Sequence, residues 1–201
     1  ALPISTGFTS SYTNYTGGQY ATTPGNNGYY KISNAGISAP SVSSGGTTLT
    51  TTSGTNGTTK ISTDWTKMAI TIPGPPTNKI DLYDFDPSTG KPTYTTSIDL
   101  GASPPTVYGV EYSADKKVIY ISMQGDGSTV KSQILQFDIS INRKSHIDSS
   151  KTVVYETMDK IGALQIDPIT QSIIFVAIQG SNSLAKITNP NGLLNPSTPV
   201  A

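Results

Sequence analysis

The sequence predicts an all-β chain, and three observations carry this prediction. The 201 residues include 29 Thr, 25 Ser, 19 Gly and 11 Tyr, residue types that favour strands and turns. Charged residues make up only 13%, against roughly 25% in an average soluble domain. Long amphipathic helical stripes are absent, and short strand–turn–strand segments recur at a fixed spacing.

The recurring segment consists of a short strand, an Asp-bearing turn and an apolar strand. Its three copies are KISTDWTKMAITI (60–72), EYSADKKVIYIS (111–122) and QIDPITQSIIFVA (165–177). The turn aspartates Asp64, Asp115 and Asp167 lie 51 and 52 residues apart. This spacing predicts that the opening hairpin of each copy belongs to one repeated unit.

A second strand follows each copy and supports the same period. These strands are KIDLYDFD (79–86), QILQFDIS (133–140) and NSLAKITN (182–189). Within them Phe85, Phe137 and Ile187 are spaced by 52 and 50 residues. Two independent landmarks therefore indicate a repeat of about 50 residues.

Several short strands in a repeat of this length are typical of the blades of a β-propeller. A β-sandwich also has many short strands, but it predicts no fixed period. We expect the continuous apolar runs 67–72 and 172–178 to be inner strands, and 93–100 and 152–157 to be outer strands. The sequence thus predicts three clear blades and a degenerate N-terminal one, as part of a larger propeller.

The predicted propeller domain has four parts along the chain. They are residues 1–59, a degenerate N-terminal blade with a Ser/Thr/Gly-rich segment; the blade 60–106; the blade 107–160; and 161–201, a blade with a Pro-rich tail. In the segment 41–59, sixteen of nineteen residues are Ser, Thr or Gly. This segment is either the outer strand of the first blade or a mobile loop.

Charge and composition argue against several classes of partner. The formal net charge is zero, the pI is about 6.8, and Arg143 is the only arginine. We therefore expect no nucleic-acid partner and no binding to anionic lipid. The sequence contains no run of 18 apolar residues, so it predicts no membrane-spanning helix. Cysteine is absent, and the Ser/Thr/Asn/Gly-rich composition favours an extracellular or bacterial cell-surface location.

The sequence predicts no catalytic residues, no metal site and no cofactor. His146 is the only histidine, and we expect it to be solvated in a polar loop. The acidic segment 81–86 could bind calcium, but Asp86 more simply caps the turn that follows it. Glu111 and Glu156 are the only glutamates, and no spacing singles out a catalytic acid pair.

Trp65 is the one residue that the sequence predicts as a binding residue. It lies at the tip of a predicted hairpin, where little core is available to bury it. An exposed tryptophan suits a contact with a partner. The alternative is that Trp65 folds back on its own hairpin or on a neighbouring blade.

The repeats resemble a known family. The segments TTKISTDWTKMAI, IDLYDFDPSTGKP, YGVEYSADKKVIYIS followed by ILQFDIS, and IGALQIDPITQSIIFVAIQGSNSLAKITNPN occur in this order. Over residues 20–195 they resemble the YVTN or WD-repeat-like β-propeller region of large secreted surface proteins of Bacteroidota. The resemblance implies a propeller, type IX secretion and an association with gliding or adhesion.

The chain departs from that family in its turns and in its extent. Its turns read Thr-Asp-Trp-Thr and Ala-Asp-Lys-Lys in place of Pro-Asp-Gly-Lys, and it offers fewer blades than the family usually closes with. A downstream sorting domain is also missing. We therefore expect the remainder of a longer chain, or association with other copies, to complete the propeller.

Together these observations predict a non-enzymatic extracellular β-propeller module for binding, adhesion or surface assembly. Its partners would be another protein or a glycan at the cell surface. The first alternative is a structural subunit that self-assembles through open blade edges into a homo-oligomer. The second, which the sequence favours less, is a propeller enzyme of the lactonase or lyase type.

Overall fold

The computed structural model describes residues 31–33, 36–38, 57–74 and 77–194. The chain divides into two units, residues 1–53 and residues 54–201. In the first unit, β1 (Lys31–Ser33) and β2 (Gly36–Ser38) pair as an antiparallel hairpin. The rest of the predicted N-terminal blade, most of its Ser/Thr/Gly-rich segment and the end of the Pro-rich tail lie outside the described residues.

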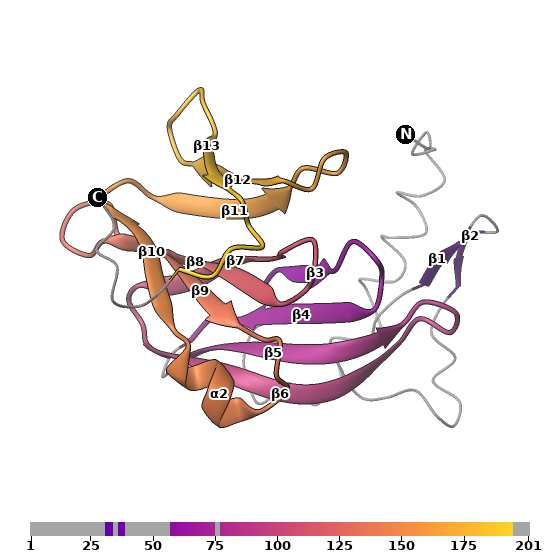
Figure 1. The fold of residues 1–201 in the computed structure, drawn as a ribbon. Helices are drawn as coiled ribbons and strands as arrows, with labels where there is room; N and C mark the ends of the chain where they lie inside the picture. The colour runs from indigo at the N-terminus through magenta and orange to yellow at the C-terminus, as the bar shows by residue number, and fades with distance from the viewer. Residues whose placement is uncertain (1–30, 34–35, 39–56, 75–76, 195–201) are drawn as a thin grey trace, which may run out of the picture. The chain divides into compact units, whose positions relative to one another are not determined.

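Three antiparallel sheets follow one another along the second unit (Figure 1). The first contains β3 (Thr59–Ile61), β4 (Lys67–Ile72), β5 (Thr77–Asp86) and β6 (Lys91–Ala102). The second contains β7 (Thr106–Tyr112), β8 (Val118–Gln124), β9 (Ser132–Asp138) and β10 (Thr152–Thr157), with the helix α2 (Lys144–Ser149) before β10. The third contains β11 (Ile161–Ile166), β12 (Ile173–Ile178) and β13 (Ala185–Thr188).

In each sheet the strands lie side by side in chain order, which is the topology of a propeller blade. The prediction of an all-β, propeller-type repeat is therefore confirmed. The described residues contain no helix long and apolar enough to cross a membrane.

The sheets pack face to face, and β8 shows how the sequence produces this packing. Ile119 and Ile121 belong to an apolar cluster shared with the first sheet. Val118 and Tyr120 belong to a second cluster, shared with the third sheet. Because successive side chains of a strand point to opposite faces, an unbroken apolar run buries both faces of the middle sheet.

The prediction that the apolar runs are the inner strands is wrong, because each run lies one strand further out in its sheet. The apolar runs 67–72 and 172–178 form β4 and β12, the second strands of their sheets. The innermost strands are β3, β7 and β11, and β7 contacts both of the others. A second strand is hydrogen-bonded on both edges and packed on its faces, so it needs apolar side chains. An innermost strand has one open edge and can carry polar ones.

The turns after the innermost strands correct the predicted alignment of the repeats. The amides of Ser62 and Ser113 pair with the carbonyl five residues further on, at 2.9 Å in both sheets. In the third sheet Asp167 makes this bond, to the carbonyl six residues further on. Asp167 is therefore the counterpart of the two serines and not of Asp64 and Asp115, because the third turn is one residue longer.

A segment after β13 binds the second sheet through one buried glutamine. The Gln136 Nε2 donates to the carbonyl of Gly192 at 2.8 Å, and its Oε1 accepts from the amide of Leu194 at 2.8 Å. Burial raises the pKa of Tyr120, so its hydroxyl stays protonated and donates to the carbonyl of Pro190 at 3.1 Å. These bonds fasten the end of the third blade to the second.

We expect Gln136→Leu to lower the free energy of unfolding by about 1–3 kcal/mol, because two backbone groups of the segment lose their partner. Chemical denaturation measures this loss. The control is Gln133→Leu on the same strand, whose amide bonds the exposed Glu156. Equal effects of the two substitutions would contradict the fastening role of Gln136.

Candidate functional site

The innermost strands bring three polar side chains together. Lys60 lies on β3, Glu111 on β7 and Gln165 on β11. Each lies two residues before the amide that begins the inner turn of its sheet. The three residues therefore occupy the same position in three successive blades, and we call them the floor of the site.

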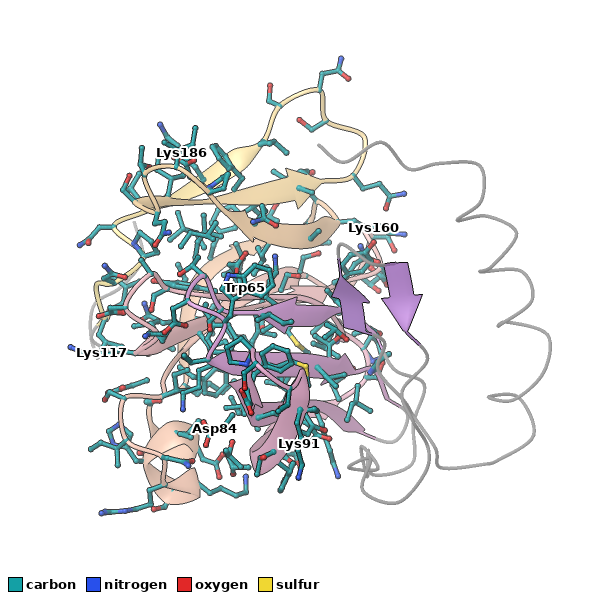
Figure 2. The ribbon with its side chains drawn as sticks, turned by 90° about the vertical axis from the view of Figure 1, so that its right-hand side faces the viewer. Trp65, Asp84, Lys91, Lys117, Lys160 and Lys186 are labelled. Carbon is teal, nitrogen blue, oxygen red and sulfur yellow. The ribbon has the colours of Figure 1, made fainter. Side chains whose placement is uncertain are left out.

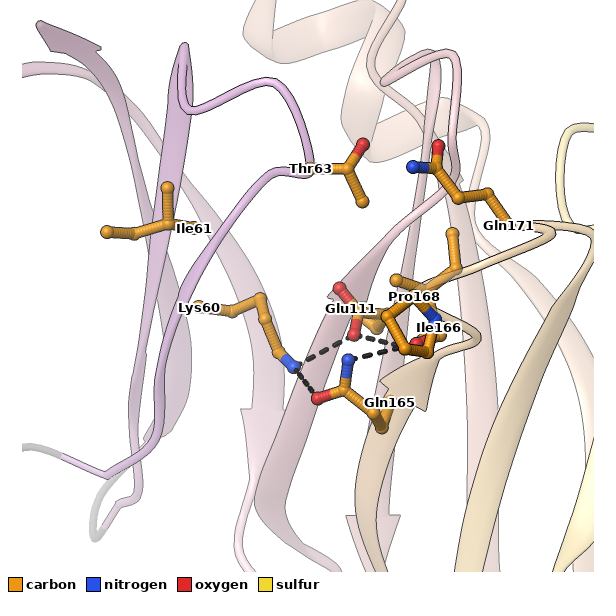
Figure 3. Close-up of a pocket in the computed structure, with 8 residues that line it drawn as sticks. All are labelled: Lys60, Ile61, Thr63, Glu111, Gln165, Ile166, Pro168 and Gln171. Carbon is orange, nitrogen blue, oxygen red and sulfur yellow. Dashed lines mark hydrogen bonds and ion pairs between the residues drawn. The ribbon is translucent and has the colours of Figure 1, made fainter. Parts of the chain in front are cut away.

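Direct contacts hold the floor together (Figure 3). The Lys60 Nζ lies 2.8 Å from the Glu111 Oε2 and 2.9 Å from the Gln165 Oε1. The same glutamate oxygen accepts the amide of Ile166 at 2.8 Å, and the other carboxylate oxygen accepts the amide of Tyr112 at 3.0 Å. Glu111 thus joins a cation from the strand on one side to the backbone of the strand on the other.

The floor is polar, and its charged pair is shielded from water while Gln165 is exposed. Glu111 is 1% exposed, and the side chain of Lys60 is 17% exposed. A carboxylate has about four lone-pair sites and an ammonium has three donors. Contacts among the described residues use three sites of Glu111 and two donors of Lys60. One acceptor position of Glu111 and one donor of Lys60 therefore have no partner in the part of the chain that the structure describes.

A hollow of about 220 Å³ opens beside the floor. The residues that line it come from β3, β7, β11 and the turns that follow β3 and β11, and Figure 3 shows Lys60, Glu111 and Gln165 in contact beside it. Its lining residues are Lys60, Ile61, Thr63, Glu111, Gln165, Ile166, Pro168 and Gln171. The hollow is smaller than the roughly 300–1,000 Å³ of pockets for drug-sized ligands, so it suits a small molecule.

The turn after β3, which forms one edge of the hollow, is fixed by its own side chains. The hydroxyl of Ser62 donates to Asp64 at 2.8 Å, and the hydroxyl of Thr66 donates to it at 2.9 Å. Burial opposes ionisation of Asp64, but the bonds from Lys116, Ser62 and Thr66 outweigh it and hold its pKa well below the usual range. The ammonium of Lys116 also ties this turn to the equivalent turn of the second sheet.

Trp65, the predicted binding residue, lies in that same turn (Figure 2). Its side chain does not fold back into a core, since the residue is 60% exposed. Its φ is 64°, in the left-handed region that favours glycine. The structure thus places Trp65 two residues after Thr63, which lines the hollow. Its binding role stays a prediction.

The other candidate residues considered in the sequence analysis, His146 and Asp86, do not line the hollow. His146 is in α2, where its Nε2 is 3.0 Å from the Asp138 Oδ2, so the histidine expected to be solvated lies against a carboxylate. Asp86 caps its turn, accepting the amide of Ser88 at 2.9 Å. Among the residues that the structure describes, no cluster of three or more His, Cys, Asp or Glu could hold a metal ion.

Among known proteins, the chain resembles solved structures at low sequence identity. No protein-family model and no curated protein matches the chain. A solved structure of a protein from Lactobacillus plantarum matches with a TM-score of 0.47 and 13% identity, over 79% of this chain and 46% of that one. A "putative 6-phosphogluconolactonase" from Bacteroides uniformis ATCC 8492 matches with a TM-score of 0.45 and 13% identity, over 84% of this chain and 52% of that one. The chain therefore spans about half the length of these propeller-like structures.

These comparisons contradict the predicted non-enzymatic module for binding, adhesion or surface assembly, because one similar structure bears the name of an enzyme. The alternative of a self-assembling structural subunit stays a prediction, because no finding tests self-assembly. The likeness to surface proteins of Bacteroidota stays a prediction, since no family model matches. What the comparisons support is the propeller-type fold.

Sequence reasoning missed the floor, although a signal for it was present. Lys60 and Glu111 are 51 residues apart, the same spacing that separates Asp64 from Asp115. The period that predicted the blades thus also pairs a cation with a carboxylate at one blade position. Gln165 was harder to find, because the longer third turn shifts its alignment with the other two.

We expect Glu111→Gln to lower the free energy of unfolding by about 1.5–3 kcal/mol, the typical contribution of hydrogen bonds to a charged group. Denaturant titration at pH 7 gives this value. Glu156→Gln is the matched control, because Glu156 on the outermost strand β10 pairs with the exposed Lys131 and its replacement should cost less than about 1 kcal/mol. Similar losses for both variants would mean that Glu111 does not join the inner strands.

Asp64 predicts a pH dependence. Because folding depresses the pKa of Asp64, its stabilisation is complete above the ordinary pKa of about 3.8 and is lost as the pH falls below it. Asp64→Asn should therefore cost about 0.2–1 kcal/mol at pH 7 and progressively less below pH 4. Unfolding free energies measured between pH 7 and pH 2 test this. A deficit that does not shrink between pH 4 and pH 2 would contradict it.

Proposed function

We propose that this chain supplies part of the active site of a propeller enzyme that hydrolyses an ester or lactone in a small, oxygen-rich molecule. One observation carries the proposal. Equivalent positions of three blades bring Lys60, Glu111 and Gln165 into contact at the floor of a hollow. Polar groups that converge in a hollow are the common form of a small-molecule site.

Each floor residue has a chemical task in this proposal. The remaining donor of Lys60 faces the carbonyl oxygen of the substrate and stabilises the negative charge that develops on it. Gln165 holds the ammonium in place through its Oε1 at 2.9 Å. Glu111 offers its remaining acceptor position to the attacking water.

The reaction needs only water as co-reactant. The oxygen of the water molecule forms a bond to the carbonyl carbon while Glu111 accepts one proton. The tetrahedral intermediate then collapses, the bond between the carbonyl carbon and the ester oxygen breaks, and the proton passes to that oxygen. The products are a carboxylic acid, which ionises at neutral pH, and an alcohol. A lactone gives both groups in one molecule.

Sugar lactones are the first substrates to test. Their carbonyl and hydroxyl oxygens match a floor of one ammonium, one carboxylate and one amide, and they are small enough for the hollow. The name of one similar structure also sets this order of testing. An extracellular location and a longer parent chain, both predicted from the sequence, belong to the same proposal.

Lys60→Met should lower the rate of lactone hydrolysis by about 100-fold or more, the usual cost of losing one donor to a developing oxyanion. Proton release from glucono-1,5-lactone, measured with a pH indicator against the uncatalysed rate, provides the assay. Lys67→Met is the matched control, because Lys67 pairs with the exposed Asp84 at 2.5 Å and does not line the hollow.

Glu111→Gln should also lower the rate by about 100-fold or more, through loss of the base. Wild-type protein that neither binds nor hydrolyses sugar lactones would overturn the proposed reaction. If the two floor variants change only stability, the floor is a fastening between blades and not an active site.

A further inference from the structure

The turn after β3, whose Thr63 lines the hollow, carries an exposed tryptophan in an unfavourable backbone conformation. Trp65, Lys116 and Gln171 follow the three innermost strands, and their φ values are 64°, 60° and 54°. Left-handed conformations cost a non-glycine residue roughly 1–3 kcal/mol and cluster at binding sites. Gln171 lines the hollow and Lys116 bridges two turns. Trp65 has no such structural bond from its side chain among the described residues.

The turn presents Trp65 rigidly. Its amide donates to the carbonyl of Ser62 at 2.9 Å, and the neighbouring Asp64 accepts bonds from Ser62 and Thr66. A tryptophan side chain has only two rotatable bonds, so it loses little conformational freedom when it binds a ligand. Trp65 therefore offers an exposed aromatic surface on a backbone that hydrogen bonds hold in place.

The opposite edge of the hollow is also apolar. Pro168 lines the hollow, and the adjacent Ile169 is 89% exposed. A polar floor of Lys60, Glu111 and Gln165 thus lies below an edge with apolar side chains on two turns. A ligand that fits this arrangement has oxygen atoms at one side and an apolar face at another. Sugar rings have both, because their C–H bonds form apolar faces.

We propose that Trp65 packs against the ring of the molecule bound on the floor and makes the site selective for cyclic sugar acids and lactones over open-chain ones. This inference rests on the proposed function, since it assumes that the floor binds the ligand. Trp65 is then a specificity-determining residue, and the chain prefers cyclic substrate to open-chain product. Contacts with an aromatic face contribute about 0.5–1.5 kcal/mol, which corresponds to about 2- to 12-fold in affinity.

The test compares D-glucuronate, a cyclic sugar acid, with D-gluconate, an open-chain one, on the full chain. Trp65 is the only tryptophan, so its fluorescence reports directly on the ligand. We expect glucuronate to shift or quench this fluorescence and gluconate to leave it unchanged. Calorimetry measures the affinity for both acids independently of the tryptophan.

The first variant is Trp65→Gly, because glycine suits the left-handed backbone and the turn keeps its fold. We expect it to weaken glucuronate about 2- to 12-fold and to leave gluconate unchanged, with Trp65→Tyr restoring most of the affinity. Tyr94→Gly, at a half-exposed tyrosine on the outermost strand β6, is the control and should affect neither acid.

The outcomes separate this inference from the proposed function. If wild-type protein binds neither acid, the proposed function fails and the selectivity of Trp65 falls with it. If both acids bind but Trp65→Gly weakens them equally or not at all, the inference about Trp65 is overturned and the floor remains a binding site. Selective loss of glucuronate supports both.

Discussion

The contact between Glu111 and the strands on either side of it is the constraint on which the candidate site depends. Its carboxylate pairs with the ammonium of Lys60 on β3 at 2.8 Å. It also accepts a hydrogen bond from the backbone amide of Ile166 on β11 at 2.8 Å. At 1% exposure, a carboxylate is stable only when such partners satisfy it. The need to pair this buried charge therefore fixes how three innermost strands meet, and their meeting creates the hollow.

Apolar packing between the sheets holds the three innermost strands next to one another. Two apolar clusters hold the second sheet between the first and the third, and β8 contributes to both. The innermost strands β7 and β11 also contribute to these clusters, but each has one open edge and can carry a charged or amide side chain among its apolar ones. Gln136 adds a polar fastening between the second and third sheets. The apolar clusters thus hold the sheets together, and the polar side chains of the floor line the hollow.

A repeat normally places similar side chains at equivalent positions, and this chain does so in its turns but not at its floor. Ser62 and Ser113 make the same bonds in consecutive blades, at nearly the same distances. At the floor the repeated position holds a cation, an anion and an amide. Different charges at one repeated position attract across blades, so a structural repeat becomes an asymmetric site.

The sequence by itself determined the all-β class and the period of about 50 residues, while the exposure of Trp65 came from the structure. These follow from local propensity, from turn chemistry and from spacing along the chain. Only the tertiary structure decided which strands are innermost and that Lys60, Glu111 and Gln165 converge. Residues 105 positions apart come into contact because the blades pack laterally. The one-residue extension of the third turn, invisible without the hydrogen bonds, hid Gln165 from the repeat alignment.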